Sequence, residues 1–119
     1  MGKRKLNYLF ICYANENRSP TAQEVCKKIA KEYSLEIDAS SAGISRGSNR
    51  PLTKEMADQA DKISVMEQHM KVTLITEYGQ NPGKIVCLDI PDVYVKNDPW
   101  LINVLQDKLL EHLAKEGLL

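Results

Sequence analysis

The sequence predicts an α/β fold, a small doubly wound, mostly parallel four-stranded sheet with helices on both faces in a three-layer αβα arrangement. The main observation is that short apolar segments alternate along the chain with segments whose apolar residues recur at helical spacing. The length of 119 residues suits a single domain over residues 1–119. Hydrophobic residues make up 43% and charged residues 27%, which excludes disordered, collagen-like and disulfide-dense classes.

The first half of the chain reads as strand, loop, helix, strand, loop. Residues 6–12 form an apolar run typical of a strand buried on both faces. Ser19 followed by Pro20 predicts a helix N-cap with proline at the first helical position. Residues 35–40 are expected to form the second strand, and residues 41–49 a loop. The helix that begins at Ser19 has one apolar face: Ala22, Val25, Cys26, Ile29 and Tyr33.

The middle of the chain continues the alternation. Thr53 is predicted to cap a short helix through Ala60, and residues 62–66 form the third strand candidate. Residues 67–78 then read as a helix closed by Gly79, since glycine readily takes the left-handed conformation that ends helices.

The last part supplies one more strand and one more helix. Residues 81–83 predict a turn, residues 84–90 the fourth strand and residues 91–97 a loop. Asp98, followed by proline, opens a helix that ends at Gly117. Its apolar positions repeat at helical spacing: Leu101, Val104, Leu105, Leu109 and Leu113.

Charge and cysteine content narrow the class of function. Sixteen basic residues balance sixteen acidic ones, so no global field favours nucleic acid or an anionic membrane as a partner. No apolar run approaches the about 20 residues that span a bilayer, and residues 1–5 lack the pattern of an export signal. Three widely spaced cysteines, Cys12, Cys26 and Cys87, predict neither a disulfide framework nor a metal site. We therefore expect a cytoplasmic protein.

The segment from Cys12 to Pro20 carries the chemistry. A cysteine ends the first strand, and an arginine follows six positions later, just before a helix start. Five intervening residues can wrap successive backbone N–H groups around one tetrahedral oxyanion, and Arg18 can grip its oxygens with a planar fork. The same groups favour the thiolate of Cys12, the nucleophilic form. The alternative is a buried structural cysteine and a surface arginine. The predicted phosphate-binding residues are Tyr13, Ala14, Asn15, Glu16, Asn17, Arg18 and Ser19.

This segment resembles the phosphate loop of the low-molecular-weight protein tyrosine phosphatase family, which has the form Cys-x5-Arg-Ser-Pro after the first strand; thioredoxin-coupled arsenate reductases share it. Residues 41–43 (Ser-Ala-Gly) and 91–94 (Pro-Asp-Val-Tyr) resemble two further motifs of the family, in the same order. The resemblance implies Cys12 as the nucleophile, Arg18 as the phosphate clamp and Asp92 as the general acid. It also implies that a hydrogen-bond network shapes the loop: Asn15, Ser19 and Ser41.

The chain also departs from the family pattern. Ala14 stands where the family commonly has glycine, and Asn17 where it has a second cysteine that can protect the nucleophile. Glu16 replaces a usual apolar residue, and no aromatic residue lies between positions 42 and 66, where the family supplies one wall of the phosphotyrosine slot. Phosphoryl chemistry is therefore better supported than phosphotyrosine as the substrate. The predicted substrate rim consists of Tyr13, Glu16 and Tyr94.

Three aspartates compete for the role of general acid, which must protonate a leaving oxygen at neutral pH. Asp92 follows the predicted fourth strand in a Pro-Asp turn, so it is the preferred candidate. Asp98 precedes a proline at a helix start, which is the pattern of an N-cap. Asp89 is placed last because it falls within the predicted strand.

The function that these residues predict is a cysteine-dependent phosphomonoesterase, protein tyrosine phosphatase-like, acting on a phosphorylated substrate through a phosphocysteine. No metal or organic cofactor is expected, because the loop and Arg18 neutralise the phosphate charge. One alternative is an arsenate reductase-like thiol enzyme, which would need Cys26 or Cys87 as a resolving thiol. The other is a catalytically weak phosphate- or phosphoprotein-binding module, which Glu16 keeps open by placing a carboxylate beside the anion site.

Overall fold

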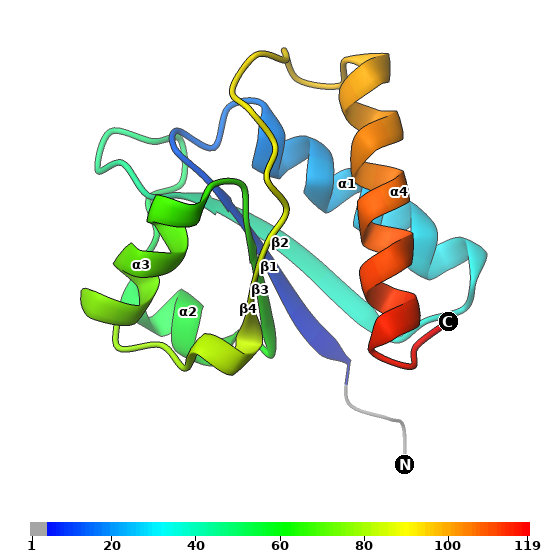
Figure 1. The fold of residues 1–119 in the computed structure, drawn as a ribbon, viewed down its shortest axis with the longest axis horizontal. Coiled ribbons are helices and arrows are strands. Elements are labelled where there is room, and N and C mark those ends of the chain that lie inside the picture. The colour runs from blue at the N-terminus through cyan, green and yellow to red at the C-terminus, as the bar shows by residue number, and fades with distance from the viewer. Residues whose placement is uncertain (1–4) are drawn as a thin grey trace.

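The computed structural model describes residues 5–119, and within this range the chain forms one four-stranded sheet (Figure 1). The strands are β1 (Leu6–Cys12), β2 (Ile37–Gly43), β3 (Lys62–Val65) and β4 (Ile85–Cys87). They lie in the order β2-β1-β3-β4, and every pair is parallel. The predicted α/β class is confirmed, with a sheet that is parallel throughout. Residues 1–4 lie outside the described residues. The prediction that residues 1–5 carry no export signal falls mostly on them.

Helices cover both faces of the sheet, as Figure 1 shows. One face carries α1 (Arg18–Glu32) and α4 (Pro99–Lys115), and the other carries the shorter α2 (Lys54–Gln59) and α3 (Gln68–Thr76). A single 3-10 turn, Pro82–Lys84, leads into β4. Because the strands are parallel, their carboxyl ends share one edge of the sheet, which is where ligands bind in folds of this type.

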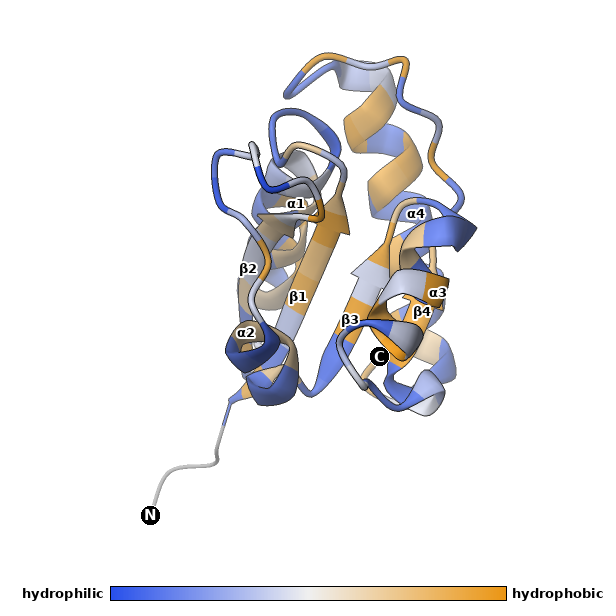
Figure 2. Ribbon diagram, turned by 90° about the vertical axis from the view of Figure 1, so that its left-hand side faces the viewer, coloured by the Kyte–Doolittle hydropathy of each residue, from blue (hydrophilic) through white to orange (hydrophobic). Residues whose placement is uncertain are grey.

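The core lies between the layers, where the apolar faces meet (Figure 2). Phe10 and Ile11 of β1 are completely buried, one toward each face, which explains the uninterrupted apolar run of this central strand. In α4, every fourth position is a buried leucine: Leu101, Leu105, Leu109 and Leu113. Each such side chain contributes about 1.5 to 3 kcal/mol when it leaves water.

Three strands end at other residues than the sequence predicts, and the third of the chain stops one residue early, at Val65 instead of residue 66. The second strand runs to Gly43 instead of residue 40, because Ser41-Ala42-Gly43 pairs with the last three residues of β1. Gly43 is required there, since a Cβ would meet the side chain of Ser48 and lie 2.8 Å from the carbonyl oxygen of Tyr13. The fourth strand ends at Cys87 instead of Ile90. Asp89 has a φ of 53°, so it lies outside the strand, contrary to the prediction.

The helix ends confirm some predicted caps and correct one. Thr53 accepts a hydrogen bond from Met56 N at the start of α2, and Asp98 accepts one from Trp100 N at the start of α4. The prediction that Ser19 caps α1 is wrong. The helix begins at Arg18, and the hydroxyl of Ser19 is used elsewhere, as described below. Pro20 is tolerated at the third helical position because the first four N–H groups of a helix have no partner in the helix.

The predicted third helix is shorter than its expected range of 67–78, since α3 covers only Gln68–Thr76. Glu67 stands at its N-cap position, two residues after the last residue of β3. Among residues 5–119, no helix combines the length and apolar character needed to cross a membrane.

Candidate active site

The segment after β1 forms a tight loop, residues 12–18, that we call the phosphate loop. Cys12 is buried at the end of the strand, with its Sγ 2.9 Å from the Oγ of Ser19 in the first turn of α1. Ser19 Oγ also donates to Asn15 Oδ1 at 2.8 Å, and Asn15 itself has the left-handed φ of 54°. The hydroxyl has one proton, so it bonds Asn15 when Cys12 is a thiol and can turn to a Cys12 thiolate.

A second segment, residues 44–50, holds the phosphate loop from behind. The backbone N–H of Ser45 donates to Tyr13 O at 2.9 Å, and that of Asn49 donates to Ala14 O at 3.2 Å. The side chain of Asn49 adds a hydrogen bond to Asn15 O at 3.3 Å. These bonds turn the loop carbonyls outward. Within residues 5–119, no acceptor takes a hydrogen bond from the backbone N–H groups of residues 13–17, so these donors remain for an anion.

Arg18 is the charged centre of the site, and only 2% of the residue is exposed. Its Nη1 donates to Glu67 Oε2 at 2.8 Å and to the carbonyl oxygen of Ile90 at 2.6 Å. Its Nε lies 3.7 Å from Asp92 Oδ1. Buried arginines need partners, and these contacts fix the guanidinium at the carboxyl edge of the sheet.

One pocket brings most of the predicted residues together. It is lined by seven residues of the phosphate loop and the loop after β4: Cys12, Tyr13, Ala14, Glu16, Asn17, Arg18 and Asp92. The carboxylate of Asp92 is mostly exposed, whereas Arg18 beside it is buried. The structure thus gathers a thiol, a guanidinium and a carboxyl group around a small opening.

The two other aspartates lie elsewhere. Asp98 Oδ1 accepts from Trp100 N at 2.8 Å and so occupies the helix-cap position that the sequence predicts. Asp89 Oδ1 accepts from the thiol of Cys87 at 3.2 Å. Neither residue lines the pocket that contains Cys12.

The loop of residues 91–97, called the acid loop because it carries Asp92, is tied to the start of α1 at its far end. The N–H of Lys96 donates to Asn17 Oδ1 at 2.9 Å. The N–H of Asn97 donates to Thr21 Oγ1 at 3.0 Å. Through these two bonds, α1 positions both the phosphate loop and the acid loop.

Two predicted residues take other places. Ser41, predicted to support the phosphate loop, donates its hydroxyl to Gln23 of α1 at 2.7 Å, so it braces the helix and not the loop. This side chain points toward α1 because residues alternate between the two faces of a strand. Tyr94 is half-buried against the core and does not line the pocket, whereas Tyr13 and Glu16 are exposed at its rim.

Sequence reasoning missed two residues of the site, Glu67 and Asn49. Glu67 directly follows the predicted third strand, residues 62–66, and acidic residues at the carboxyl ends of parallel strands are candidates for a site by position alone. That signal was available. Asn49 carried no such signal, because its role depends on how the loop of residues 44–50 folds back onto the phosphate loop.

The remaining cysteines lie away from the pocket, and all three cysteines are free thiols. Cys26 is buried in α1, and desolvation by burial raises the pKa of its thiol to about 12. Burial also raises the pKa of the Cys87 thiol, on β4. Neither thiol lines the pocket of Cys12, so neither lies where a resolving cysteine would act.

The chain is similar to known phosphatases in sequence and in fold. The sequence model described as low molecular weight phosphotyrosine protein phosphatase matches residues 7–62, which include the phosphate loop. A protein-arginine-phosphatase of Bacillus subtilis (strain 168) is 25% identical over 105 residues, covering 70% of each chain.

Solved structures share the fold. The low molecular weight protein tyrosine phosphatase from T. tengcongensis is 22% identical, with a TM-score of 0.74 over 92% of this chain and 100% of that one. Vibrio vulnificus Wzb, solved with benzylphosphonate, is 21% identical, with a TM-score of 0.75 over 93% and 99%. The chain is thus similar to low-molecular-weight protein tyrosine phosphatases in the sequence of residues 7–62 and in its fold, as its motifs predict.

Proposed function

We propose that this protein is a cysteine-dependent phosphatase in which Cys12 is the nucleophile, Arg18 clamps the phosphate and Asp92 is the general acid. The observation that carries the proposal is one pocket that joins the Cys12 thiol, the Arg18 guanidinium and the Asp92 carboxyl group. The unpaired N–H groups of residues 13–17 would hold the equatorial phosphate oxygens. The family match and the phosphatase relative support the same chemistry.

The first step transfers the phosphoryl group to the enzyme. The Cys12 thiolate attacks phosphorus, an S–P bond forms, and the bond from phosphorus to the leaving group breaks. Asp92 gives its proton to the leaving atom, so that the leaving group does not depart as an anion. Glu67 and the Ile90 carbonyl occupy Nη1 of Arg18, so its second terminal nitrogen, and its Nε when Asp92 is protonated, can bond the phosphate.

The second step returns the enzyme to its starting state. The Asp92 carboxylate takes a proton from water, the water oxygen attacks phosphorus, and the S–P bond breaks. Inorganic phosphate leaves, and Cys12 is again a thiolate that the Ser19 hydroxyl can stabilise from 2.9 Å. No other thiol takes part, which separates this reaction from arsenate reduction.

The residues at the rim of the pocket indicate which substrates it could accept. A phosphotyrosine protein is the substrate that the family implies, and Tyr13 is the aromatic side chain present at the rim. Glu16 and Asp92 place two carboxyl groups there as well. A cationic leaving group would relieve their repulsion with the incoming phosphate, and the guanidinium of phosphoarginine is such a group. The similarity to a protein-arginine-phosphatase supports this second candidate.

The setting proposed for this activity is the cytoplasm. The three free cysteines support a reducing compartment.

The activity is tested by hydrolysis of p-nitrophenyl phosphate in the presence of a chelator, comparing the wild type with Cys12→Ser. We expect metal-independent turnover that Cys12→Ser abolishes and vanadate inhibits. Cys87→Ser is the matched control, since this thiol lies outside the pocket, and it should keep wild-type turnover. Undiminished hydrolysis by Cys12→Ser would refute the proposed nucleophile.

The substrate is tested with phosphotyrosine and phosphoarginine peptides of one sequence. Glu16→Gln removes the charge and keeps the size of the side chain. If the leaving group is cationic, this variant should lose about 3- to 10-fold in kcat/KM on phosphoarginine and gain on phosphotyrosine, as expected for one partly exposed charge pair. Equal changes on both peptides would exclude a role of Glu16 in substrate choice.

A further inference from the structure

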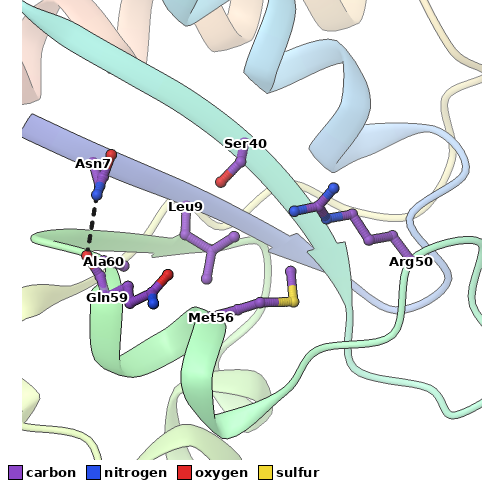
Figure 3. Close-up of a pocket in the computed structure, with 7 residues that line it drawn as sticks. All are labelled: Asn7, Leu9, Ser40, Arg50, Met56, Gln59 and Ala60. Carbon is purple, nitrogen blue, oxygen red and sulfur yellow. Dashed lines mark hydrogen bonds between the residues drawn. The ribbon is translucent and has the colours of Figure 1, made fainter.

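A second cavity, of about 150 Å³, lies on the α2 face of the sheet (Figure 3). Leu9 of β1 forms its apolar floor, and Met56 and Ala60 form a wall on the side of α2. None of its lining residues belongs to the pocket of Cys12. The cavity exists because α2 has only six residues and leaves part of β1 and β2 uncovered. A cavity of this volume has room for a benzene ring.

Polar groups surround this apolar floor. Figure 3 shows the guanidinium of Arg50 reaching over the sheet toward Ser40, with the hydroxyl of Ser40 directed into the same space. The side chains of Arg50 and Ser40 make no hydrogen bond or ion pair with any residue in the described range 5–119. At the other end, Asn7 uses one of its amide hydrogens, in a long 3.3 Å bond to Gln59 O. The cavity is therefore lined by a cation and three neutral polar side chains, those of Asn7, Ser40 and Gln59, around an apolar centre, which is the composition of a ligand site.

We propose that this cavity binds a small aromatic carboxylate of about the size of benzoate. The ring would pack on Leu9 and Met56, and the carboxylate would accept the two parallel N–H bonds that the Arg50 fork provides. The hydroxyl of Ser40 would donate to the same carboxylate. A neutral aromatic molecule would fill the floor but leave Arg50 unpaired, so the site distinguishes the two by charge.

The cavity is connected to the phosphate loop through the backbone. Arg50 O accepts from Gly43 N at 2.8 Å, and Gly43 lies beside Cys12 in the sheet. Asn49, the residue before Arg50, holds the carbonyls of Ala14 and Asn15. A ligand that fixes Arg50 thus also restrains the segment that supports the phosphate loop. The proposal includes this coupling: benzoate binding strengthens phosphate binding, and phosphate strengthens benzoate binding by the same factor.

The binding step is tested by titrating benzoate while observing the methyl signal of Met56 by NMR. Saturating inorganic phosphate is present, so that benzoate cannot bind at the phosphate loop and contribute to the signal. We expect a saturable shift in the wild type and at least tenfold weaker binding in Arg50→Ala, as for the loss of a charge-assisted bidentate contact. Arg46→Ala is the matched control, because it removes the other arginine of the same loop, which does not line the cavity.

Two outcomes would overturn the site: equal benzoate affinity in Arg50→Ala and the wild type, or benzyl alcohol binding as tightly as benzoate. Arg50 is exposed, so its replacement should leave the thermal melt unchanged, and the melt verifies folding. The coupling is tested by the dissociation constant of inorganic phosphate with and without saturating benzoate. A constant that benzoate does not lower would refute the coupling. Loss of phosphatase activity alone would bear on Cys12 and not on this cavity.

Discussion

The phosphate loop and the acid loop face each other across one pocket, yet they are built in opposite ways. In the phosphate loop the working side chains are buried, with Cys12 3% and Arg18 2% exposed. In the acid loop the Asp92 side chain is 63% exposed, and Val93 next to it is 74% exposed. The first loop is fixed by many contacts along its length. The second is tied by two backbone N–H groups at its far end, one to Asn17 of the phosphate loop and one to Thr21 of α1.

This difference teaches which part of the chemistry needs a fixed geometry. Phosphate oxygens must find several donors at once, so these donors are arranged before the substrate arrives. A general acid delivers one proton to one atom, and an exposed carboxyl group reached by a short loop is sufficient. Changes in the phosphate loop should therefore damage phosphate binding, whereas changes in the acid loop should damage turnover alone.

The largest effect on turnover in this comparison is expected from Asp92→Asn. The amide cannot donate a proton in place of the acid, so hydrolysis should slow by about 10²- to 10⁴-fold. The loss should be largest for poor leaving groups and smallest for activated phenols, because only the former need protonation. Rates on a series of aryl phosphates measure this dependence, and the phosphate dissociation constant should stay within a few-fold of the wild type.

Asp89→Asn is the control for this change, because Asp89 follows the same strand and does not line the pocket. Its rates should match those of the wild type across the series. A wild-type leaving-group dependence in Asp92→Asn would assign the acid to another residue.

The next effect concerns Glu67, which holds Arg18. Glu67→Ala removes the 2.8 Å contact and leaves the buried guanidinium with the Ile90 carbonyl as its remaining short hydrogen bond. We expect kcat/KM to fall about 10- to 100-fold, as for a lost charge-assisted hydrogen bond, together with weaker phosphate binding. Glu67→Gln keeps an acceptor oxygen and should recover part of the loss. Phosphate binding that is equal in all three proteins would show that Glu67 does not position Arg18.

Much of the fold could be predicted because its signals are local. The apolar run of β1, the Asp98 cap and the leucine repeat of α4 each report their own segment, and the alternation of elements gives the class. The residues at which strands end were harder to predict from the sequence. The length of β2 depends on pairing with β1, and the left-handed backbone of Asp89 after β4 has no clear sequence signature.

The residues of the candidate site also fall into two groups, those with a local sequence signal and those without one. The spacing of Cys12 and Arg18 is a local pattern, and their proximity follows from one loop. The contacts of Glu67 and Asn49 join segments far apart in the chain, so no spacing reveals them. Ser41 shows the opposite case: a motif matched the family pattern, but the side chain bonds Gln23 of α1, because its position in β2 directs it toward that helix.

A smaller effect is expected from Thr21→Val, which keeps the shape of the side chain and removes its hydroxyl. Thr21 Oγ1 accepts from Asn97 N at 3.0 Å and donates to Asn17 O at 2.7 Å. Without the tether, the acid loop is held by the Lys96 bond, so kcat should fall about 2- to 10-fold while phosphate affinity holds. Thr76→Val is the matched control, because its hydroxyl bonds a carbonyl of its own helix and no loop. Equal kcat values in the two variants would mean that the tether does not position Asp92.

The smallest effect on turnover is expected from Asp98→Ala, although this residue directly follows the acid loop. Its carboxylate caps α4 by accepting from Trp100 N, and loss of such a cap costs about 0.5 to 2 kcal/mol of folding free energy. The melting temperature should therefore drop by a few degrees, while rates on the aryl phosphate series keep the wild-type leaving-group dependence. Asp107→Ala, an exposed change in the middle of the same helix, controls for the loss of a charge and should leave the melt nearly unchanged. If Asp98→Ala showed the steep dependence expected of Asp92→Asn, the proton would come from the helix cap, and the division between a fixed phosphate loop and a tethered acid loop would place the acid on the wrong residue.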